Sequence, residues 1–516
     1  MFVSRLALAA AFVAPAAALA APASDEADSY FKAGQDELAA RAAVKPIRHG
    51  ARNVILFIGD GMDPTTVAAS RIYDGQTRGE EGEENYLSFE RFPWIAMSKT
   101  YNTDAQTPDS AGTMSAIMTG VKTKMGVLSL TDRVMRDDCS SAPASMTATV
   151  GELAKSKGLA LGVVTTTRIT HATPAAVYAH SPERDWERDT NLPPKAVKDG
   201  CKDIARQLID FTDGGVDVAL GGGRENFLPV DAKDPEYAVK TGGRADGRNL
   251  VEEWEKKGGV YVWDEKGFAA LEAKKNPKVL GLFEPSHMKY ELDRAHDRAG
   301  EPSLAEMTTK AIEILANNKK GYFLMVEGGR IDHAHHAGNA ARALSETQEL
   351  SKAVAAARAM TNVNDTLVIV TADHGHTMSF SGYPKKGSPI LGLATSALDD
   401  APKSDDHSPD ADEPENGGYA LAADGKPYTT LSYANGPGTV LLGQKKAGER
   451  ETLTEEEVLD INFRQQSLIP SRSETHGGQD VTIYASGPDA YLFGGVVEEN
   501  YIFHVIDKAL SLRRKK

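Results

Sequence analysis

The chain has 516 residues, and its 58 Lys and Arg against 73 Asp and Glu give a formal net charge of −15. This acidity argues against a protein that binds nucleic acid or anionic membranes through a generally basic surface, so no nucleic-acid binding is expected. Hydrophobic residues make up 41% of the chain and charged residues 25%, which is the usage of an ordinary globular protein.

The first 20 residues have the pattern of a secretory signal peptide. Arg5 precedes an apolar, Ala-rich run over residues 6–19, and Ala18-Leu19-Ala20 forms a small-x-small cleavage site. The pattern predicts an exported protein, either periplasmic or secreted. Residues 21–50 are expected to form a polar N-terminal arm. The C-terminal residues 513–516 are basic and follow no hydrophobic tail, so no membrane anchor is expected.

After the arm, continuous apolar runs alternate with helical patterns. Such runs are typical of parallel strands covered on both faces. Strand–helix alternation predicts an α/β fold with a doubly wound, mostly parallel central sheet flanked by helices. Helices are expected over residues 303–317 and 340–360. The predicted strands cover residues 53–58, 159–165, 216–220, 322–326, 366–371 and 481–485.

Two stretches depart from this alternation. Residues 383–436 contain an acidic segment rich in Pro and Gly at 404–418, and they are expected to form an inserted, cap-like region. Residues 225–301 are expected to form a second excursion from the core, with Trp254 and Trp263 as apolar anchors.

Polar side chains follow four of the predicted strands at the point where each strand ends. The ligand crevice of an open α/β sheet lies at the carboxyl ends of its strands. These side chains are therefore expected to converge within a single domain over residues 51–516. They are Asp60, His171, Thr173, Glu327, Asp373 and His374.

Carboxylates and imidazoles dominate these positions and recur at three others. Asp332 and His336 are four residues apart and so share one face of a helix, and His476 lies beside a Gly pair. Taken singly, each cluster also fits a helix cap or a solvated turn. Mixed nitrogen and oxygen ligands favour zinc, and carboxylate-rich sets favour magnesium. Seven candidates predict two close metals, an arrangement that catalyses displacement at phosphorus. They are Asp60, Glu327, Asp332, His336, Asp373, His374 and His476.

Ser110 and Arg184 are candidates for a nucleophile and a phosphate clamp. The residues around Ser110 place it at a helix N-terminus, where N–H groups and the helix dipole favour an anion. Plain N-capping by Asp109 or Ser110 explains the same pattern. Arg184 offers two parallel N–H donors for phosphate, or it pairs with the neighbouring acids Glu183 and Asp185 at the surface.

Cys139 and Cys201 are the two cysteines of the chain. In an exported protein an even pair favours a disulfide. Two buried free thiols are the alternative.

The order of these motifs resembles the alkaline phosphatase family over about residues 50–505. The matching features are the Asp60 turn, Pro-Asp-Ser110, the segment from Glu327 to His336, Thr-Ala-Asp373-His374 and Thr475-His476. Finer features resemble the animal branch, namely His171-Ala172-Thr173, Leu282-Phe283-Glu284-Pro285 and the cysteine pair.

The resemblance implies two Zn²⁺, one Mg²⁺ and a phosphoserine intermediate on Ser110. Arg184 would bind the phosphate, and His376 would orient Asp332. The first zinc would take Asp332, His336 and His476. The second would take Asp60, Asp373 and His374. Magnesium would take Asp60, Thr173 and Glu327, with His171 nearby through water. A Ca²⁺ site of the animal-like branch corresponds to Glu236, the carbonyl of Phe283, Glu284 and Glu301.

The same resemblance implies a homodimer that hydrolyses small-molecule phosphate monoesters. Two other functions stay open. One is a phosphodiesterase of the same superfamily, and the other is a non-catalytic metal-binding surface protein. Ser110 together with Thr173, Glu327 and Arg184 favours monoesters over diesters.

Overall fold

A computed structural model describes residues 29–211, 214–395, 418–438 and 450–513. The chain divides into two units, residues 1–45 and residues 46–516. In the first unit, α1 (Ser29–Ala43) is a helix whose residues are all exposed. The predicted signal peptide, residues 1–20, lies outside the described residues.

The second unit is built on a ten-stranded sheet in the order β15-β2-β14-β8-β1-β7-β3-β4-β6-β5. All six predicted strands are present in it, so the predicted α/β architecture is confirmed. The strands are β1 (Asn53–Gly59), β2 (Trp94–Lys99), β3 (Ala160–Arg168), β4 (Val218–Gly222), β5 (Val260–Val262), β6 (Val279–Leu282), β7 (Tyr322–Gly328), β8 (Thr366–Thr371), β14 (Val481–Ser486) and β15 (Val496–Glu498).

The sheet is mixed, because β14 runs antiparallel to both of its neighbours, β8 and β2. The other pairings in the sheet are parallel. The apolar run at 481–485 correctly predicts a strand buried in the sheet. Burial alone does not fix strand direction, so this reversal had no signal in the hydrophobic pattern.

Strand β1 shows why its apolar run is unbroken. Val54, Leu56 and Ile58 pack into one hydrophobic core, whereas Ile55 and Phe57 pack into a second core on the opposite face. Successive strand side chains point to opposite faces. A strand covered on both faces therefore has no position that favours a polar residue.

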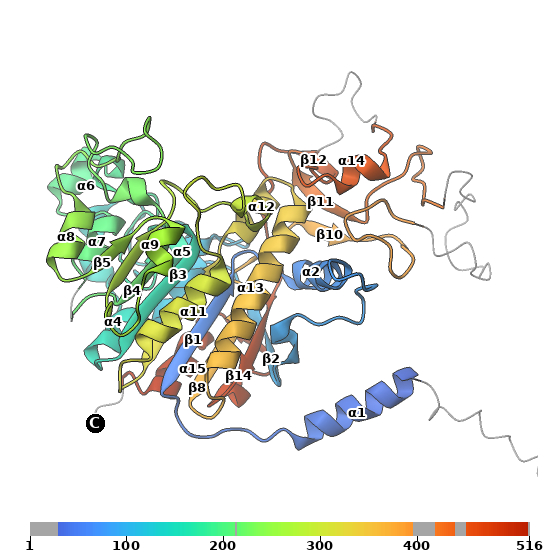
Figure 1. Ribbon diagram of the computed structural model, residues 1–516, viewed down its shortest axis with the longest axis horizontal. Coiled ribbons are helices and arrows are strands. Elements are labelled where there is room, and N and C mark those ends of the chain that lie inside the picture. The colour runs from blue at the N-terminus through green and yellow to red at the C-terminus, as the bar shows by residue number, and fades with distance from the viewer. Residues whose placement is uncertain (1–28, 212–213, 396–417, 439–449, 514–516) are drawn as a thin grey trace, which may run out of the picture. The chain divides into compact units, whose positions relative to one another are not determined.

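Helices cover both faces of the sheet (Figure 1). On one face α11 (Leu304–Leu315) and α13 (Ala340–Met360) pack on the strands, and α2 (Pro64–Gln76) and α12 (Arg330–His336) pack on α13. The opposite face carries α3 (Ser110–Thr119), α4 (Val150–Ser156), α5 (Ala172–Ala175) and α15 (Tyr501–Leu510).

Residues 225–301 are not an excursion from the core, as expected above, because they supply β5 and β6 to one edge of the main sheet. Trp254 is buried there and donates from Nε1 to the carbonyl of Val260 at 3.1 Å. The helices of this edge region are α8 (Leu250–Lys256), α9 (Glu265–Ala269) and α10 (Glu291–Arg294). Two helices precede it in the chain, α6 (Pro194–Lys198) and α7 (Ile204–Ile209), and α7 packs on α8.

A small three-stranded sheet, here called the satellite sheet, has the order β10-β11-β12. It consists of β10 (Met378–Phe380), β11 (Leu431–Gly436) and β12 (Ser467–Pro470), with α14 (Glu455–Leu459) between the last two in sequence. The predicted insertion at 383–436 thus ends in β11, and its residues 396–417 lie outside the described part. A two-stranded ribbon pairs β9 (Gly375–His376) with β13 (His476–Gly477).

Cys139 and Cys201 form a disulfide, as predicted, with 5.8 Å between their Cα atoms. The bridge packs against Trp186, Leu192 and Ala196. Among the described helices, none combines the length and the apolar character needed to cross a bilayer.

Candidate active site

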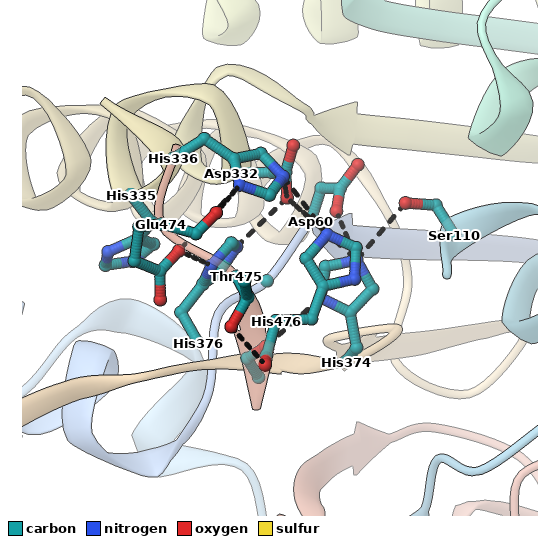
Figure 2. Close-up of polar contacts among 12 residues, drawn as sticks. Asp60, Ser110, Asp332, His335, His336, His374, His376, Glu474, Thr475 and His476 are labelled. Carbon is teal, nitrogen blue, oxygen red and sulfur yellow. Dashed lines mark hydrogen bonds and ion pairs between the residues drawn. The ribbon is translucent and has the colours of Figure 1, made fainter. Parts of the chain in front are cut away.

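The predicted ligands come together at the carboxyl edge of the main sheet, and Figure 2 shows five of them, Asp60, Asp332, His336, His374 and His476. Asp60 follows β1, Glu327 is the penultimate residue of β7, and Asp373 with His374 follows β8. Helix α12 brings Asp332 and His336, and β13 brings His476 to the same point through its pairing with β9. The convergence expected from the strand ends is therefore found.

Glycine makes the Asp60 turn possible. Gly61 has a φ of 70°, which favours glycine, and a Cβ atom there would lie 2.3 Å from the ring of His376. The backbone N–H of Gly61 donates to Asp373 Oδ1 at 3.1 Å. The turn is thus packed directly against the side chains of the site.

Asp332, His336 and His476 form the first group. Their facing atoms lie within 3.3 Å of one another: His336 Nε2 and His476 Nε2 are each 3.3 Å from Asp332 Oδ1 and 3.1 Å apart. The Nδ1 atom of His336 donates to the carbonyl of Glu474 at 2.6 Å, and that of His476 donates to the carbonyl of Pro108 at 2.8 Å.

These backbone hydrogen bonds fix the tautomers. A neutral imidazole that donates from Nδ1 has a lone pair on Nε2. Two nitrogen lone pairs and a carboxylate oxygen therefore face one point, an arrangement that suits a metal cation. The donor set fits zinc, which binds imidazole nitrogen and carboxylate oxygen.

Asp60, Asp373 and His374 form the second group and are fully buried. His374 Nε2 lies 3.2 Å from Asp60 Oδ1 and 3.6 Å from Asp373 Oδ2. Within the described part of the chain, both carboxylate oxygens of Asp60 are buried without a hydrogen-bond partner. Burial and the neighbouring carboxylates, chiefly Asp373, raise the pKa of Asp60 well above its usual range. A bound cation would compensate this negative charge.

A third group surrounds Glu327. Its Oε2 accepts hydrogen bonds from Thr165 and Thr167, whereas its Oε1 and the hydroxyl of Thr173 are buried without a partner among the described residues. Asp60, His171 and Glu327 offer ligand atoms that lie within 4.8 Å of one another. Burial raises the pKa of Glu327 to about 7. Oxygen-rich donors of this kind fit magnesium.

Ser110 is the first residue of α3, and Asp109 is its N-cap, accepting from the N–H of Gly112 at 3.1 Å. Asp109 therefore caps the helix, as one of the two sequence interpretations expects, and the hydroxyl of Ser110 faces the second group of candidate ligands. Ser110 Oγ lies 3.1 Å from His374 Nε2 (Figure 2).

Arg184 does not pair with its neighbouring acids. Its Nη1 donates to Asp109 Oδ2 at 3.0 Å, and its Nη2 lies 3.2 Å from His171 Nε2. Glu183 pairs with Arg136 at 2.6 Å. Asp109 thus ties the guanidinium to the N-terminus of the helix that carries Ser110.

His376 bridges two carboxylates, one of which belongs to Asp332. Its Nε2 lies 3.0 Å from Asp332 Oδ1 and its Nδ1 lies 2.6 Å from Glu474 Oε2. Burial opposes a charge here, but Glu474 and Asp332 raise the pKa of His376 to about 10. Sequence reasoning gave Glu474 no role, and its position two residues before His476 was the available signal.

The predicted calcium ligands lie in the edge region, and two of them form ion pairs with basic side chains. Arg224 Nη2 lies 3.0 Å from Glu236 Oε2, and Lys289 Nζ lies 2.7 Å from Glu284 Oε1. Burial, together with Asp297 and Glu284, raises the pKa of Glu301 to about 8. Asp297, which sequence reasoning missed, has both carboxylate oxygens buried without a hydrogen-bond partner in the described chain.

Comparison with known proteins decides the family. The model of the family described as alkaline phosphatase matches residues 51–512. The chain belongs to the alkaline phosphatase family. It is 44% identical over 470 residues to the tissue-nonspecific alkaline phosphatase of Gallus gallus, covering 90% of this chain and 85% of that protein. The predicted resemblance to the animal branch is confirmed by this vertebrate relative.

Solved alkaline phosphatases share the fold. The crystal structure of the Thermus thermophilus alkaline phosphatase aligns with a TM-score of 0.63 at 24% identity, covering 91% of this chain and 93% of that one. A variant of the TAB5 alkaline phosphatase with Mg bound in its M3 site aligns with a TM-score of 0.58 at 20% identity, covering 90% of this chain and 100% of that one. The chain is an alkaline phosphatase, an enzyme that hydrolyses phosphate monoesters at a metal centre.

Proposed function

We propose that this alkaline phosphatase works through a phosphoserine on Ser110 beside two zinc ions and one magnesium ion. The observation that carries the proposal is the position of Ser110 Oγ, at the N-terminus of α3 and 3.1 Å from His374 Nε2. The first zinc would be held by Asp332, His336 and His476, and the second by Asp60, Asp373 and His374.

In the proposed reaction Ser110 Oγ attacks phosphorus, the ester P–O bond breaks and the alcohol leaves. Water then hydrolyses the phosphoserine and returns the serine hydroxyl with inorganic phosphate. The zinc ions, when bound, supply Lewis-acid stabilisation of the serine and leaving-group oxygens. The N–H groups at the start of α3 favour the phosphoryl group.

Arg184 would bind the phosphoryl oxygens. Its contacts with Asp109 and His171 hold the guanidinium beside Ser110 before substrate arrives. A side chain that is already oriented loses less entropy on binding, and its two N–H donors match two phosphate oxygens.

Magnesium would be held by Asp60, Thr173 and Glu327, with His171 nearby. The buried, unpartnered oxygens of these three ligands in the described chain support this assignment. Calcium would be held by Glu236, the carbonyl of Phe283, Glu284 and Glu301, and Asp297 would join them. The side chains of Arg224 and Lys289, which pair with Glu236 and Glu284, would have to move for calcium to bind.

The wider assignments are also part of the proposal. We propose a signal peptide over 1–20, an arm over 21–50 and a single catalytic domain over 51–516 with an insertion at about 383–436. The disulfide is compatible with export, to the periplasm or outside the cell. The enzyme would act as a homodimer.

The test is hydrolysis of a chromogenic phosphate monoester and the matching diester by the purified mature chain, before and after chelation. We expect chelator-sensitive turnover of the monoester, little turnover of the diester, and loss of turnover in Ser110→Ala at unchanged metal content. Preference for the diester would assign the protein to the sister class. Turnover by Ser110→Ala would contradict the phosphoserine route.

A further inference from the structure

A buried chain of hydrogen bonds joins the satellite sheet to α12. Tyr433 lies on β11 and is 2% exposed, and its hydroxyl is 2.8 Å from His335 Nδ1. The other ring nitrogen, His335 Nε2, is 3.1 Å from Thr66 Oγ1. Thr66 Oγ1 in turn donates to Asp63 Oδ1 at 3.0 Å, at the N-cap of α2. His335 itself is completely buried.

The direction of each hydrogen bond follows from the number of protons available. Thr66 has one hydroxyl proton and gives it to Asp63, so its oxygen accepts from His335 Nε2–H. His335 Nδ1 then has a lone pair, which accepts the hydroxyl proton of Tyr433. Each donor has one acceptor, so the orientation and tautomer of the His335 ring are fixed from both sides.

His335 lies against the histidine that holds Asp332. The rings of His335 and His376 stack with their centroids 4.6 Å apart and 30° between their planes. His376 Nε2 lies 3.0 Å from Asp332 Oδ1. A neutral ring fixed beneath His376 limits how far that side chain can turn away from the carboxylate.

We infer that Tyr433 and His335 are positioning residues for Asp332, so that the satellite sheet governs how firmly the first zinc is held. This inference rests on the proposed role of Asp332 as a zinc ligand. Residues behind metal ligands commonly change metal affinity by about 10–100-fold. Tyr433 acts through two intervening rings, which favours the lower end of that range.

The alternative is that Tyr433 only fills the small core that it shares with Met378 and Leu431. In that case removing its hydroxyl would alter thermal stability but not zinc release. The two explanations therefore differ in a measurement that does not depend on turnover.

The test compares Tyr433→Phe with the parent in the zinc-loaded enzyme. Zinc release into excess chelator is followed with a colorimetric indicator, and thermal unfolding is recorded in parallel. We expect about 10-fold faster release of one zinc per chain. The matched control is Tyr261→Phe on β5, because the hydroxyl of Tyr261 is also buried but has no hydrogen-bond partner in the described part of the chain. Equal release rates in Tyr433→Phe and Tyr261→Phe would overturn the inference.

Three further variants make the outcome decisive. His335→Asn removes the stacked ring, and the double variant with Tyr433→Phe should release zinc no faster than His335→Asn alone, because both changes interrupt one chain of contacts. Additive effects would contradict that chain. Asp332→Asn must itself accelerate zinc release, and its failure to do so would instead refute the proposed ligand.

Discussion

Glu346 is a buried carboxylate outside the proposed metal sites, and its replacement tests how the fold tolerates alkaline conditions. It lies on α13, is 3% exposed, and accepts a hydrogen bond from the backbone N–H of Glu291 at 2.6 Å. Burial raises the pKa of Glu346 to about 8, and the nearby carboxylates of Glu291 and Glu349 act in the same direction. We expect Glu346→Gln to make the protein more stable at high pH.

The direction of this effect follows from the number of protons that Glu346 binds in the folded and unfolded states. Between the ordinary pKa of 4.5 and about 8, the folded state keeps a proton that the unfolded state has lost. The contribution of the protonated Glu346 to the free energy of unfolding is therefore present in full below about pH 4.5 and is lost as the pH rises through about 8. The full difference corresponds to at most about 5 kcal/mol. Glutamine cannot ionise, and it keeps an oxygen for the N–H of Glu291, so the variant avoids this loss.

The assay is thermal unfolding of variant and parent at fixed metal concentrations from pH 5 to pH 9.5. For a chain of this length, a change of 1 kcal/mol in the free energy of unfolding shifts the thermal midpoint by about 1 °C. The midpoint of the variant relative to that of the parent should therefore rise by about 2–5 °C between pH 5 and pH 9.5. The matched control is Glu349→Gln on the same helix, because Glu349 also accepts a backbone N–H, from Ala305, but pairs with Lys352 at 3.3 Å. A difference that is constant with pH would refute the reasoning.

Three other outcomes are expected. Arg184→Lys should raise the inhibition constant of inorganic phosphate about 10-fold or more, because an ammonium group cannot give two parallel N–H donors. An unchanged inhibition constant would exclude Arg184 as the residue that binds the phosphoryl oxygens. Replacing Cys139 and Cys201 by serine should lower the free energy of unfolding by about 4 kcal/mol, because the bridge spans 62 residues, and a reductant should then have no further effect on the thermal midpoint. Calcium should raise the thermal midpoint of the parent but not of Glu301→Gln, and a parent insensitive to calcium would contradict that site.

The central strands and the metal-binding motifs could be predicted because their signals are local. The apolar run of β1 and the carboxylate of Asp60 adjoin in sequence, and strand ends share one edge of the sheet. Strands β5 and β6 were missed since each has only three or four residues and lies inside a stretch rich in polar side chains. Strands this short contain too few residues to show a hydrophobic pattern that distinguishes them from a loop.

The surroundings of the ligands could not be predicted, because they depend on contacts between distant segments. The partner of Arg184 is Asp109, 75 residues away, whereas the sequence offered Glu183 and Asp185 beside it. Adjacent acids are plausible partners in any helix or loop, and only the three-dimensional turn at α3 brings Asp109 closer. Glu474 and Asp297 were missed for a related reason. Glu474 stands two residues before His476, but its contact with His376, 98 residues away, forms only in the fold, and Asp297 has no distinguishing spacing.

Backbone carbonyls orient both imidazoles of the first proposed zinc site. His336 and His476 each donate from Nδ1 to a carbonyl, and the two carbonyls belong to Glu474 and Pro108, which are more than 350 residues apart in sequence. A carbonyl is present at every residue, so no residue type reveals this role. Candidate metal-binding side chains can therefore be proposed from a sequence, whereas the backbone groups that orient their lone pairs are identified only in the folded chain.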